Sequence, residues 1–336
     1  MQKKRIIILL FLLVFAIVLV GAVKLIFLRN NSPGGWQRSN PSGICGNRYC
    51  ANGSLINNGL YYLPYQGVNN ITSNSNYSMQ EGYVNNSDSG GYHSDAINIT
   101  PELDNLGVDF EPFNSSSGYA GSFKFDEGII THNPSHSVVP GINKVFLEYG
   151  IQVKNGNGEY KTLPHYTYVL PYGTNITAVS KMRIDIIAYQ PDSNDYEIQG
   201  AYESDNGSIS SWRIDYDHIT GLSDSLMAAF NNAKNEGKVT SSSISSETAS
   251  VKVNVNSGDI LGESSGVIEL MVFYPNNQTT ITTYCPIALM NSNVSGEYKN
   301  KVNSLENDWE KYTGDMTLYN PSNEVLPGCL YNTIYG

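Results

Sequence analysis

The sequence predicts a mainly β protein that begins with one apolar helix. From residue 126 to about 290, short runs rich in Val, Ile and Tyr alternate with Gly, Pro and Asn turn signals, which is the pattern of successive strands. Only two later stretches place apolar residues at helical spacing. Near the start, residues 6–23 form a run of eighteen without a charge or a hydroxyl group. We therefore expect a β domain behind a membrane anchor.

The apolar segment at residues 6–28 is long enough to cross a bilayer. At about 1.5 Å per helical residue it spans a hydrocarbon core of roughly 30 Å. Basic residues within 1–5 precede it, which favours a cytoplasmic N-terminus and an extracellular remainder. The alternative is a cleaved signal peptide, but such peptides usually have an apolar stretch of about 7 to 15 residues, and Gly21-Ala22 is a weak cleavage site. We predict a single-pass signal-anchor in the cell membrane, with residues 1–5 as the cytoplasmic tail.

The composition separates this basic start from an acidic remainder. The chain has 336 residues, a net charge of −11 and only 15% charged residues, and much of its polarity comes from 38 Asn residues. After residue 29 there are 15 basic and 31 acidic side chains, which argues against a nucleic-acid partner because phosphates attract a basic surface. Residues 29–125 are rich in Asn, Ser, Gly and Tyr. We expect an extracellular segment that is either a flexible, glycosylated stalk with some short strands, which we favour, or an irregular, Tyr-packed layer on the next domain.

Eleven Asn-x-Ser/Thr triplets follow the anchor. A chain rich in Asn and Ser also produces such triplets by chance, and their use requires a host with glycosylation machinery. Their placement wholly on the expected outer side is consistent with a glycosylated surface protein. The candidate acceptors are Asn30, Asn52, Asn70, Asn76, Asn85, Asn98, Asn114, Asn175, Asn206, Asn277 and Asn293.

The four cysteines are also typical of an extracellular protein. A disulfide between Cys45 and Cys50 would close a short loop, and Cys285 and Cys329 would then form the second pair, although the sequence leaves the pairing open. A zinc knuckle at the first two cysteines would need a second close ligand pair. The last two lie 44 residues apart with no histidine near either. We expect disulfides.

The β domain is expected at residues 126–290, and a helix and tail at 291–336 are expected to pack on it. Turn signals such as Pro171-Tyr172-Gly173 and Asn206-Gly207 separate the apolar runs. The expected strands are 143–149, 165–170, 175–179, 182–189, 196–202, 209–219, 251–255, 266–274 and 279–284.

Two amphipathic helices complete the expected elements. In the first, apolar residues recur at helical spacing from Leu222 to Ala233, with Ser223 in the N-cap position. In the second, they recur from Tyr298 to Tyr312. We interpret both apolar stripes as packing faces rather than ligand sites.

Four short motifs occur in one order between residues 130 and 290. Residues 169–179 contain an apolar-Pro-x-Gly-x-apolar hairpin, and residues 251–262 contain a strand followed by Gly-Asp-Ile-Leu-Gly. Between them, residues 216–219 read Tyr-Asp-His-Ile, and residues 266–270 form a later strand. The set resembles the lysostaphin-like zinc endopeptidases and, more distantly, biotinyl/lipoyl-type barrels. The resemblance implies a small β-barrel or sandwich of the duplicated hybrid motif type, with one or two inserted or C-terminal helices.

The resemblance also implies a zinc ligand set, and this chain departs from it. In the family, a His-x-x-x-Asp segment and the second His of a His-x-His pair hold zinc, which keeps an open position for water. Neither motif occurs here, and Leu270 stands in the place of the His-x-His ligand. Only His218, in the place of an auxiliary catalytic histidine, is retained. We expect neither zinc nor another cofactor, and a His218 that is hydrogen-bonded to Asp217 or to a backbone group rather than catalytic.

No other reactive site is evident in the sequence. His132 and His136 are four residues apart, but Pro134 argues against the helix that would align them, so His136 is a weak candidate. Glu269 could replace a ligand only if it faced the barrel interior, which strand alternation leaves open. No nucleophile elbow, phosphate loop or dinucleotide fingerprint occurs.

The sequence favours a membrane-anchored surface protein with a non-catalytic, peptidase-like domain for envelope binding or architecture. A surface rich in Tyr, Asn and Ser suits stacking and hydrogen bonding to envelope glycans, and other surface proteins are further candidate partners. One alternative is an active zinc-dependent endopeptidase or amidase of the cell envelope, which requires a complete ligand set. Another is a structural surface glycoprotein, which requires dense occupancy of the Asn acceptors.

Overall fold

A computed structural model describes residues 97–132, 143–154, 160–191, 193–241, 247–277 and 280–336. All described residues belong to one compact unit. The expected anchor at 6–28 lies outside the described residues. Within the described ranges, no helix has both the length and the apolar composition needed to cross a membrane.

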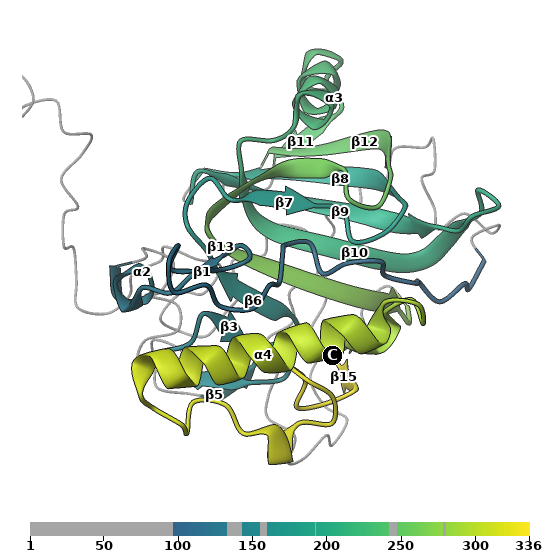
Figure 1. Ribbon diagram of the computed structural model, residues 1–336. Coiled ribbons are helices and arrows are strands. Elements are labelled where there is room, and N and C mark those ends of the chain that lie inside the picture. The colour runs from purple at the N-terminus through teal and green to yellow at the C-terminus, as the bar shows by residue number, and fades with distance from the viewer. Residues whose placement is uncertain (1–96, 133–142, 155–159, 192, 242–246, 278–279) are drawn as a thin grey trace, which may run out of the picture. The chain divides into compact units, whose positions relative to one another are not determined.

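An antiparallel sheet of eleven strands dominates the described residues and confirms the mainly β prediction (Figure 1). The resemblance implied a small barrel or sandwich, and the barrel form is wrong because the sheet is open. The main path runs β11-β12-β8-β9-β10-β13-β14-β15, so that β14 and β15 extend the sheet away from β11 and the two ends do not meet. The bounds along this path are β8 Met182–Gln190, β9 Asp195–Glu203, β10 Ile209–Thr220, β11 Val239–Ser241, β12 Glu247–Val255, β13 Ile260–Pro275, β14 Ile281–Tyr284 and β15 Thr333–Tyr335.

Three further strands of this sheet lie off the main path. Strands β6 and β7 pair with β13, and β3 pairs with β6. Two small sheets, β1-β2 and β4-β5, were not predicted because their strands are too short for a period of two to be seen. The bounds of these strands are β1 Tyr119–Ala120, β2 Phe123–Lys124, β3 Phe146–Leu147, β4 Gln152–Lys154, β5 Tyr160–Thr162, β6 Tyr166–Val169 and β7 Asn175–Thr177.

Strand β13 holds the main sheet together. It is 16 residues long, where the sequence predicted a strand only at 266–274. One edge of β13 pairs with β10, and the other pairs in turn with β7, β6 and β14. Most of its side chains are buried on both faces, which explains why its sequence lacks a clean alternation of apolar and polar residues.

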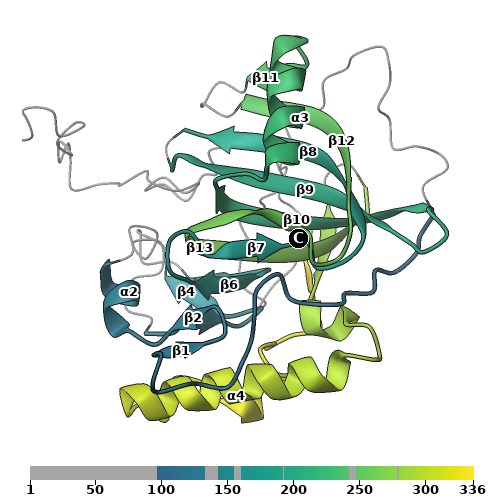
Figure 2. The same ribbon diagram turned by 45° about the horizontal axis from the view of Figure 1, so that its top comes forward.

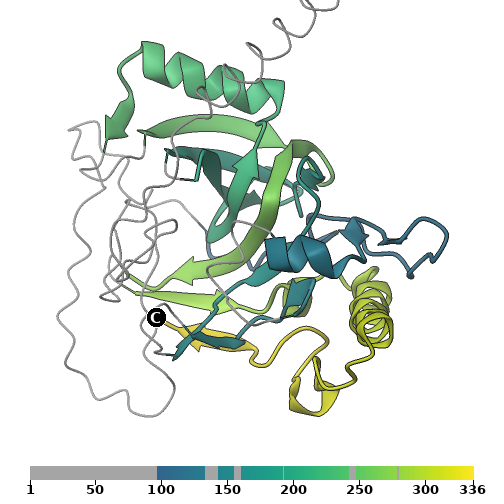
Figure 3. The ribbon, with the colours of Figure 1, turned by 90° about the vertical axis from the view of Figure 1, so that its left-hand side faces the viewer.

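Helices α3 and α4 lie at opposite ends of the main sheet (Figures 1 to 3). Helix α3 contacts β12, and the ring of its Phe230 packs edge-on against Tyr196 of β9. Helix α4 buries Val302, Leu305 and Trp309, and both predicted apolar faces are therefore packing faces. The helices are α2 Glu127–His132, α3 Asp224–Asn235 and α4 Ser295–Thr313, and the short 3-10 helices are η2 Pro286–Leu289 and η3 Pro321–Asn323.

Residues 97–125 belong to the same core as the strands that follow. Phe110 and Phe123 are fully buried, and their rings pack against each other and against Tyr168 of β6. Phe125 packs edge-on against Trp309 of α4. The predicted domain boundary between residues 125 and 126 therefore does not coincide with a break in the packing, because aromatic side chains cross it.

Candidate functional site

The retained family-like histidine, His218, lies at an irregularity of β10. Relative to β9, β10 carries one extra residue between Tyr216 and Ile219, which is a β-bulge. The backbone of His218 has φ 67°, a left-handed conformation that non-glycine residues rarely adopt. On the other side, pairing with β13 shifts between Asp217 and Ile219, where β13 continues its pairing with β6. The bulge thus places two successive side chains, Asp217 and His218, in one buried cluster.

Two aspartates surround the imidazole of His218. Its Nδ1 lies 2.9 Å from Oδ2 of Asp195, the first residue of β9, and its Nε2 lies 3.6 Å from Oδ2 of Asp217. The backbone N–H of His218 donates to Oδ1 of Asp217 at 2.9 Å. Further donors fix the two aspartates, since Gln190 Nε2 donates to Asp217 Oδ1 at 2.6 Å and Ser193 Oγ to Asp195 Oδ1 at 2.5 Å. The cluster is a buried, hydrogen-bonded group of side chains from β8, β9, β10 and the turn between β8 and β9.

The charges of this cluster favour a protonated imidazole. Burial alone would lower the pKa of His218, but the charges of Asp217 and Asp195 and the hydrogen bond to Asp195 outweigh burial and raise this pKa to about 10. At neutral pH, His218 is therefore an imidazolium between two carboxylates. A histidine of this kind neither accepts a proton as a general base nor offers a lone pair to a metal.

A second histidine, His165, lies just before β6 in a contrasting environment. Its Nε2 is 3.4 Å from Oε2 of Glu269 on β13, and its Nδ1 is 3.1 Å from Oγ1 of Thr167. Burial lowers the pKa of His165, and Glu269 only partly offsets this effect. Burial also lowers the pKa of the neighbouring Lys161 to about 8, against the opposite effect of Glu269. The charge of Glu269 also contributes to the raised pKa of His218, so Glu269 interacts with both buried histidines.

The His218 cluster does not fit the catalytic zinc that the family would require. One donor atom each of Asp195, Asp217 and His218 lies within 4.8 Å of the others, and no other group among the described residues has metal-ligand spacing. However, these side chains are only 2%, 2% and 8% exposed, whereas a catalytic ion needs a position open to water and substrate. The two aspartates also face different nitrogens of one imidazole. A metal ion would bind only one of these nitrogens, so the aspartate at the other nitrogen would not be its ligand.

The other predicted residues are divided between described and undescribed parts of the chain. The disulfide between Cys285 and Cys329 is present and is buried. The pair Cys45 and Cys50 and the weak candidate His136 lie outside the described residues, as do the first five Asn acceptors. Six acceptors are described, and all six are exposed, as glycan attachment requires: Asn98, Asn114, Asn175, Asn206, Asn277 and Asn293.

Sequence reasoning named Asp217 as a partner of His218 but missed Asp195 and Gln190. Asp217 binds the backbone N–H of His218, and Asp195 provides the short contact to the imidazole ring. The available signal was the position of these two polar residues: Gln190 directly follows the predicted strand 182–189, and Asp195 directly precedes the predicted strand 196–202. The two strands form a hairpin that precedes the strand at 209–219. Antiparallel pairing of β9 with β10 turns that hairpin end toward His218.

Comparisons with known proteins find similarity to solved structures only. No protein-family model and no curated protein matches the chain. Two crystal structures of Csd3 from Helicobacter pylori, a LytM-like peptidase-family protein, are similar to this chain at 10% and 8% identity, each with a TM-score of 0.28. The matches cover 59% and 70% of this chain but only 45% of Csd3, so the chain spans less than half of that protein. A TM-score of this size does not establish a shared fold.

Proposed function

We propose that this protein is a membrane-anchored surface protein that binds or organises the cell envelope without catalysis. The observation that carries the proposal is the environment of His218, the one family-like catalytic position. Its ring is held between two buried aspartates and is protonated at neutral pH, which suits a structural ion-pair cluster and not a hydrolytic site. The expected anchor at residues 6–28 would hold the described domain at the outer face of the membrane.

Exposed tyrosines support a binding role. Tyr172, Tyr335 and Tyr160 are 72%, 64% and 62% exposed, although an aromatic ring of this size is usually more buried. An exposed tyrosine offers a flat apolar face for a sugar ring and a hydroxyl for its polar groups. We therefore favour an envelope glycan as the ligand class.

The test combines binding and hydrolysis. The full chain in detergent is mixed with insoluble, peptide-crosslinked envelope polysaccharide, with added zinc or with chelator. We expect the protein to sediment with the polymer and to release no soluble fragments under either condition. The variants Tyr172→Ala and Tyr335→Ala should weaken sedimentation, whereas Val325→Ala, which changes an exposed aliphatic residue, should not. Zinc-dependent release of fragments would contradict the proposal and support the endopeptidase alternative, and absence of binding would contradict the glycan ligand.

A second candidate is a structural surface glycoprotein, and the exposure of all six described acceptors favours it. This role predicts that most acceptors carry glycans in the native host and that the protein binds no envelope polymer. Intact mass before and after enzymatic deglycosylation, together with the sedimentation assay, separates the two candidates. A mass that deglycosylation does not change would rule out the second.

A further inference from the structure

A second group of buried charges lies outside the His218 cluster and is centred on helix α4. Glu306 of α4 is only 2% exposed, and neither of its carboxyl oxygens has a hydrogen-bond partner among the described residues. Glu148, which follows β3, is equally buried. One of its oxygens accepts a 2.6 Å hydrogen bond from Nζ of Lys144, and the other has no such partner. A buried carboxylate without a donor is unfavourable, so this region requires a compensating proton.

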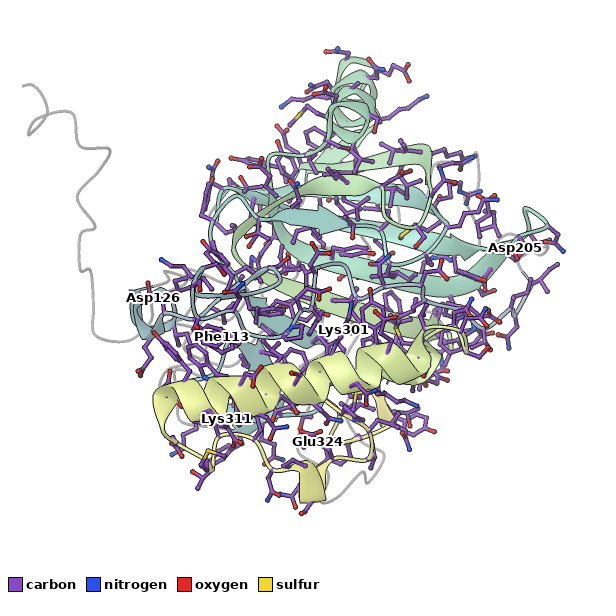
Figure 4. All side chains as sticks on the ribbon, in the orientation of Figure 1. Phe113, Asp126, Asp205, Lys301, Lys311 and Glu324 are labelled. Atoms are coloured by element: carbon purple, nitrogen blue, oxygen red, sulfur yellow. A yellow bond between two sulfur atoms is a disulfide. The ribbon has the colours of Figure 1, made fainter. Side chains whose placement is uncertain are left out.

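Two more carboxyl groups connect this cluster to the segment that follows α4. The backbone N–H of Gly328 donates to Oε2 of Glu324 at 2.9 Å, while the other oxygen of Glu324 is buried without a hydrogen-bond partner. The backbone N–H of Tyr319 donates to Oε1 of Glu310 on α4 at 2.9 Å. Figure 4 labels Glu324 on this segment, next to α4. The carboxyl groups therefore lie between the helix and the C-terminal segment.

The charges of the cluster are unbalanced. If every carboxyl group were ionised, four negative charges would face a single ammonium group, that of Lys144. The phenols that face Glu306 remain neutral, since burial raises the pKa of each. Burial, followed by the charges of Glu324 and Glu148, raises the pKa of Glu306 to about 9. The groups that face Glu306 are Glu148 and Lys144 beside β3, Glu310 on α4, Glu324 and Tyr319 on the C-terminal segment, and Tyr166 on β6.

Glu324 itself titrates nearer neutrality. Burial raises its pKa to about 7, although the hydrogen bond from Gly328 opposes this shift. Raising the pH therefore adds negative charge to the segment that faces Glu306. This charge is added in a region of low dielectric constant, where like charges repel strongly.

The segment is attached firmly at its ends and weakly between them. The hydroxyl of Tyr319 donates to the carbonyl of Phe146 at 2.8 Å, and the N–H of Tyr149 donates to the carbonyl of Gly328 at 2.9 Å. The disulfide at Cys329 ties the far end to Cys285. Between these points, residues 320–327 are exposed or half-buried. Their contacts with the rest of the domain include the packing of Leu326 against the core and a 3.4 Å hydrogen bond from the hydroxyl of Tyr166 to the carbonyl of Pro327, so moving them costs little buried apolar surface.

We propose that this carboxyl cluster is a proton-dependent latch. While Glu306 and Glu324 hold their protons, the segment from Asn320 to Pro327 stays closed over α4. As the pH rises and these groups ionise, the segment lifts to bring both carboxylates into water. It moves, rather than the helix or β3, because the helix buries Leu305 and Trp309 in the core. The disulfide limits the opening to a loop and prevents unfolding of the tail.

The latch can be tested by amide hydrogen exchange of the full chain in detergent, followed by mass spectrometry at pH 5, 7 and 9. Rates are expressed as protection factors, which removes the intrinsic pH dependence of exchange. Protection of residues 320–327 should fall about tenfold or more by pH 9, the effect of one pKa unit or more of differential proton binding. Protection of β8, β9 and β10 should not follow this titration. Equal protection of the segment at pH 5 and pH 9 would overturn the proposal.

Variants identify the groups responsible. Glu306→Gln removes one of the two titrating groups while keeping the shape, and it should make the fall in protection between pH 5 and pH 9 clearly smaller than in the wild type. Glu297→Gln is the matched control, because Glu297 is an exposed residue of the same helix. Lys144→Met should move the release to higher pH, because the ammonium group of Lys144 lowers the pKa of both Glu306 and Glu324. This result remains informative if Glu306→Gln does not fold. A wild-type pH profile in folded Glu306→Gln, or a Lys144→Met profile that is not shifted, would also overturn the latch.

Discussion

Nδ1 of His218 lies 2.9 Å from Oδ2 of Asp195, and this short contact joins two neighbouring strands at a bulge. Both side chains are buried, and neighbouring side chains bind Asp195 and Asp217 from the β8–β9 hairpin. The ring is thus fixed in place and charged.

Replacing His218 should destabilise the protein strongly. Asparagine tolerates the left-handed backbone at this position, so His218→Asn removes the cation without adding strain. Two buried aspartates are then left without their counter-charge, and the free energy of unfolding should fall by about 3 to 5 kcal/mol. Urea titration monitored by tryptophan fluorescence measures this change. The double variant Asp195→Asn, His218→Asn should recover part of the loss, whereas a single variant as stable as the wild type would contradict the ion-pair role.

The pKa values of the two buried histidines should be shifted in opposite directions. The pKa of His218 is raised from its ordinary value of 6.5 to about 10, whereas burial lowers the pKa of His165. NMR of ¹³C-labelled histidine should show His218 still protonated at pH 8, whereas His165 should lose its proton below the ordinary pKa of 6.5. Because the folded state holds the His218 proton more tightly, the associated stability is complete below about pH 6.5 and is lost as the pH rises toward 10. A His218 signal that titrates near pH 6.5 would show that the aspartates do not act as described.

A methyl group at Gly262 should disturb the strand pair next to His218. A Cβ at this position would lie 2.6 Å from Cγ2 of Ile219, the buried residue that follows His218. Gly262→Ala should therefore lower the free energy of unfolding by about 1 to 3 kcal/mol. Gly296→Ala in the first turn of α4 is the control, since no atom lies within 4 Å of its added Cβ. That variant should be neutral or slightly stabilising, and equal effects at the two sites would argue against close packing at Gly262.

Removing the disulfide should be costly. Cys285 and Cys329 close a loop with a sequence separation of 44, and constraining a loop of this length stabilises the folded state by about 4 kcal/mol. The variant with both cysteines changed to alanine should unfold at a lower urea concentration than the wild type without reductant. Adding reductant to the wild type should produce a similar shift. Identical midpoints for all three samples would mean that the bond does not constrain the unfolded chain.

The long strands and the two helices were predictable because their patterns are local. The apolar stripe of α4 and the β-branched run of β8 each reflect one buried face. The open arrangement of the sheet was not predictable in this way. It depends on which strands share the edges of β13, and pairing partners leave no period in the sequence.

The candidate site was predictable only in part. The step Tyr216-Asp217-His218 identified the histidine by its likeness to a family motif. Its partner Asp195 belongs to another strand, and the bulge that brings the two together requires an unusual backbone angle at His218 that residue type does not indicate. The carboxyl cluster at Glu306 was missed for a similar reason. A glutamate on an amphipathic helix is usually exposed, whereas Glu306 is buried and faces groups beside β3, on β6 and on the C-terminal segment.

The shared edges of β13 also determine the order in which the protein can assemble during synthesis. Strands β6, β7 and β10 all find partners in residues 260–275, so their edges remain unsatisfied until that part of the chain has emerged. Exposed edges of this kind invite pairing with other chains. A nascent chain that carries β6 to β10 therefore needs protection from aggregation until β13 emerges, and its folding is expected to be slow because the decisive contacts span about a hundred residues.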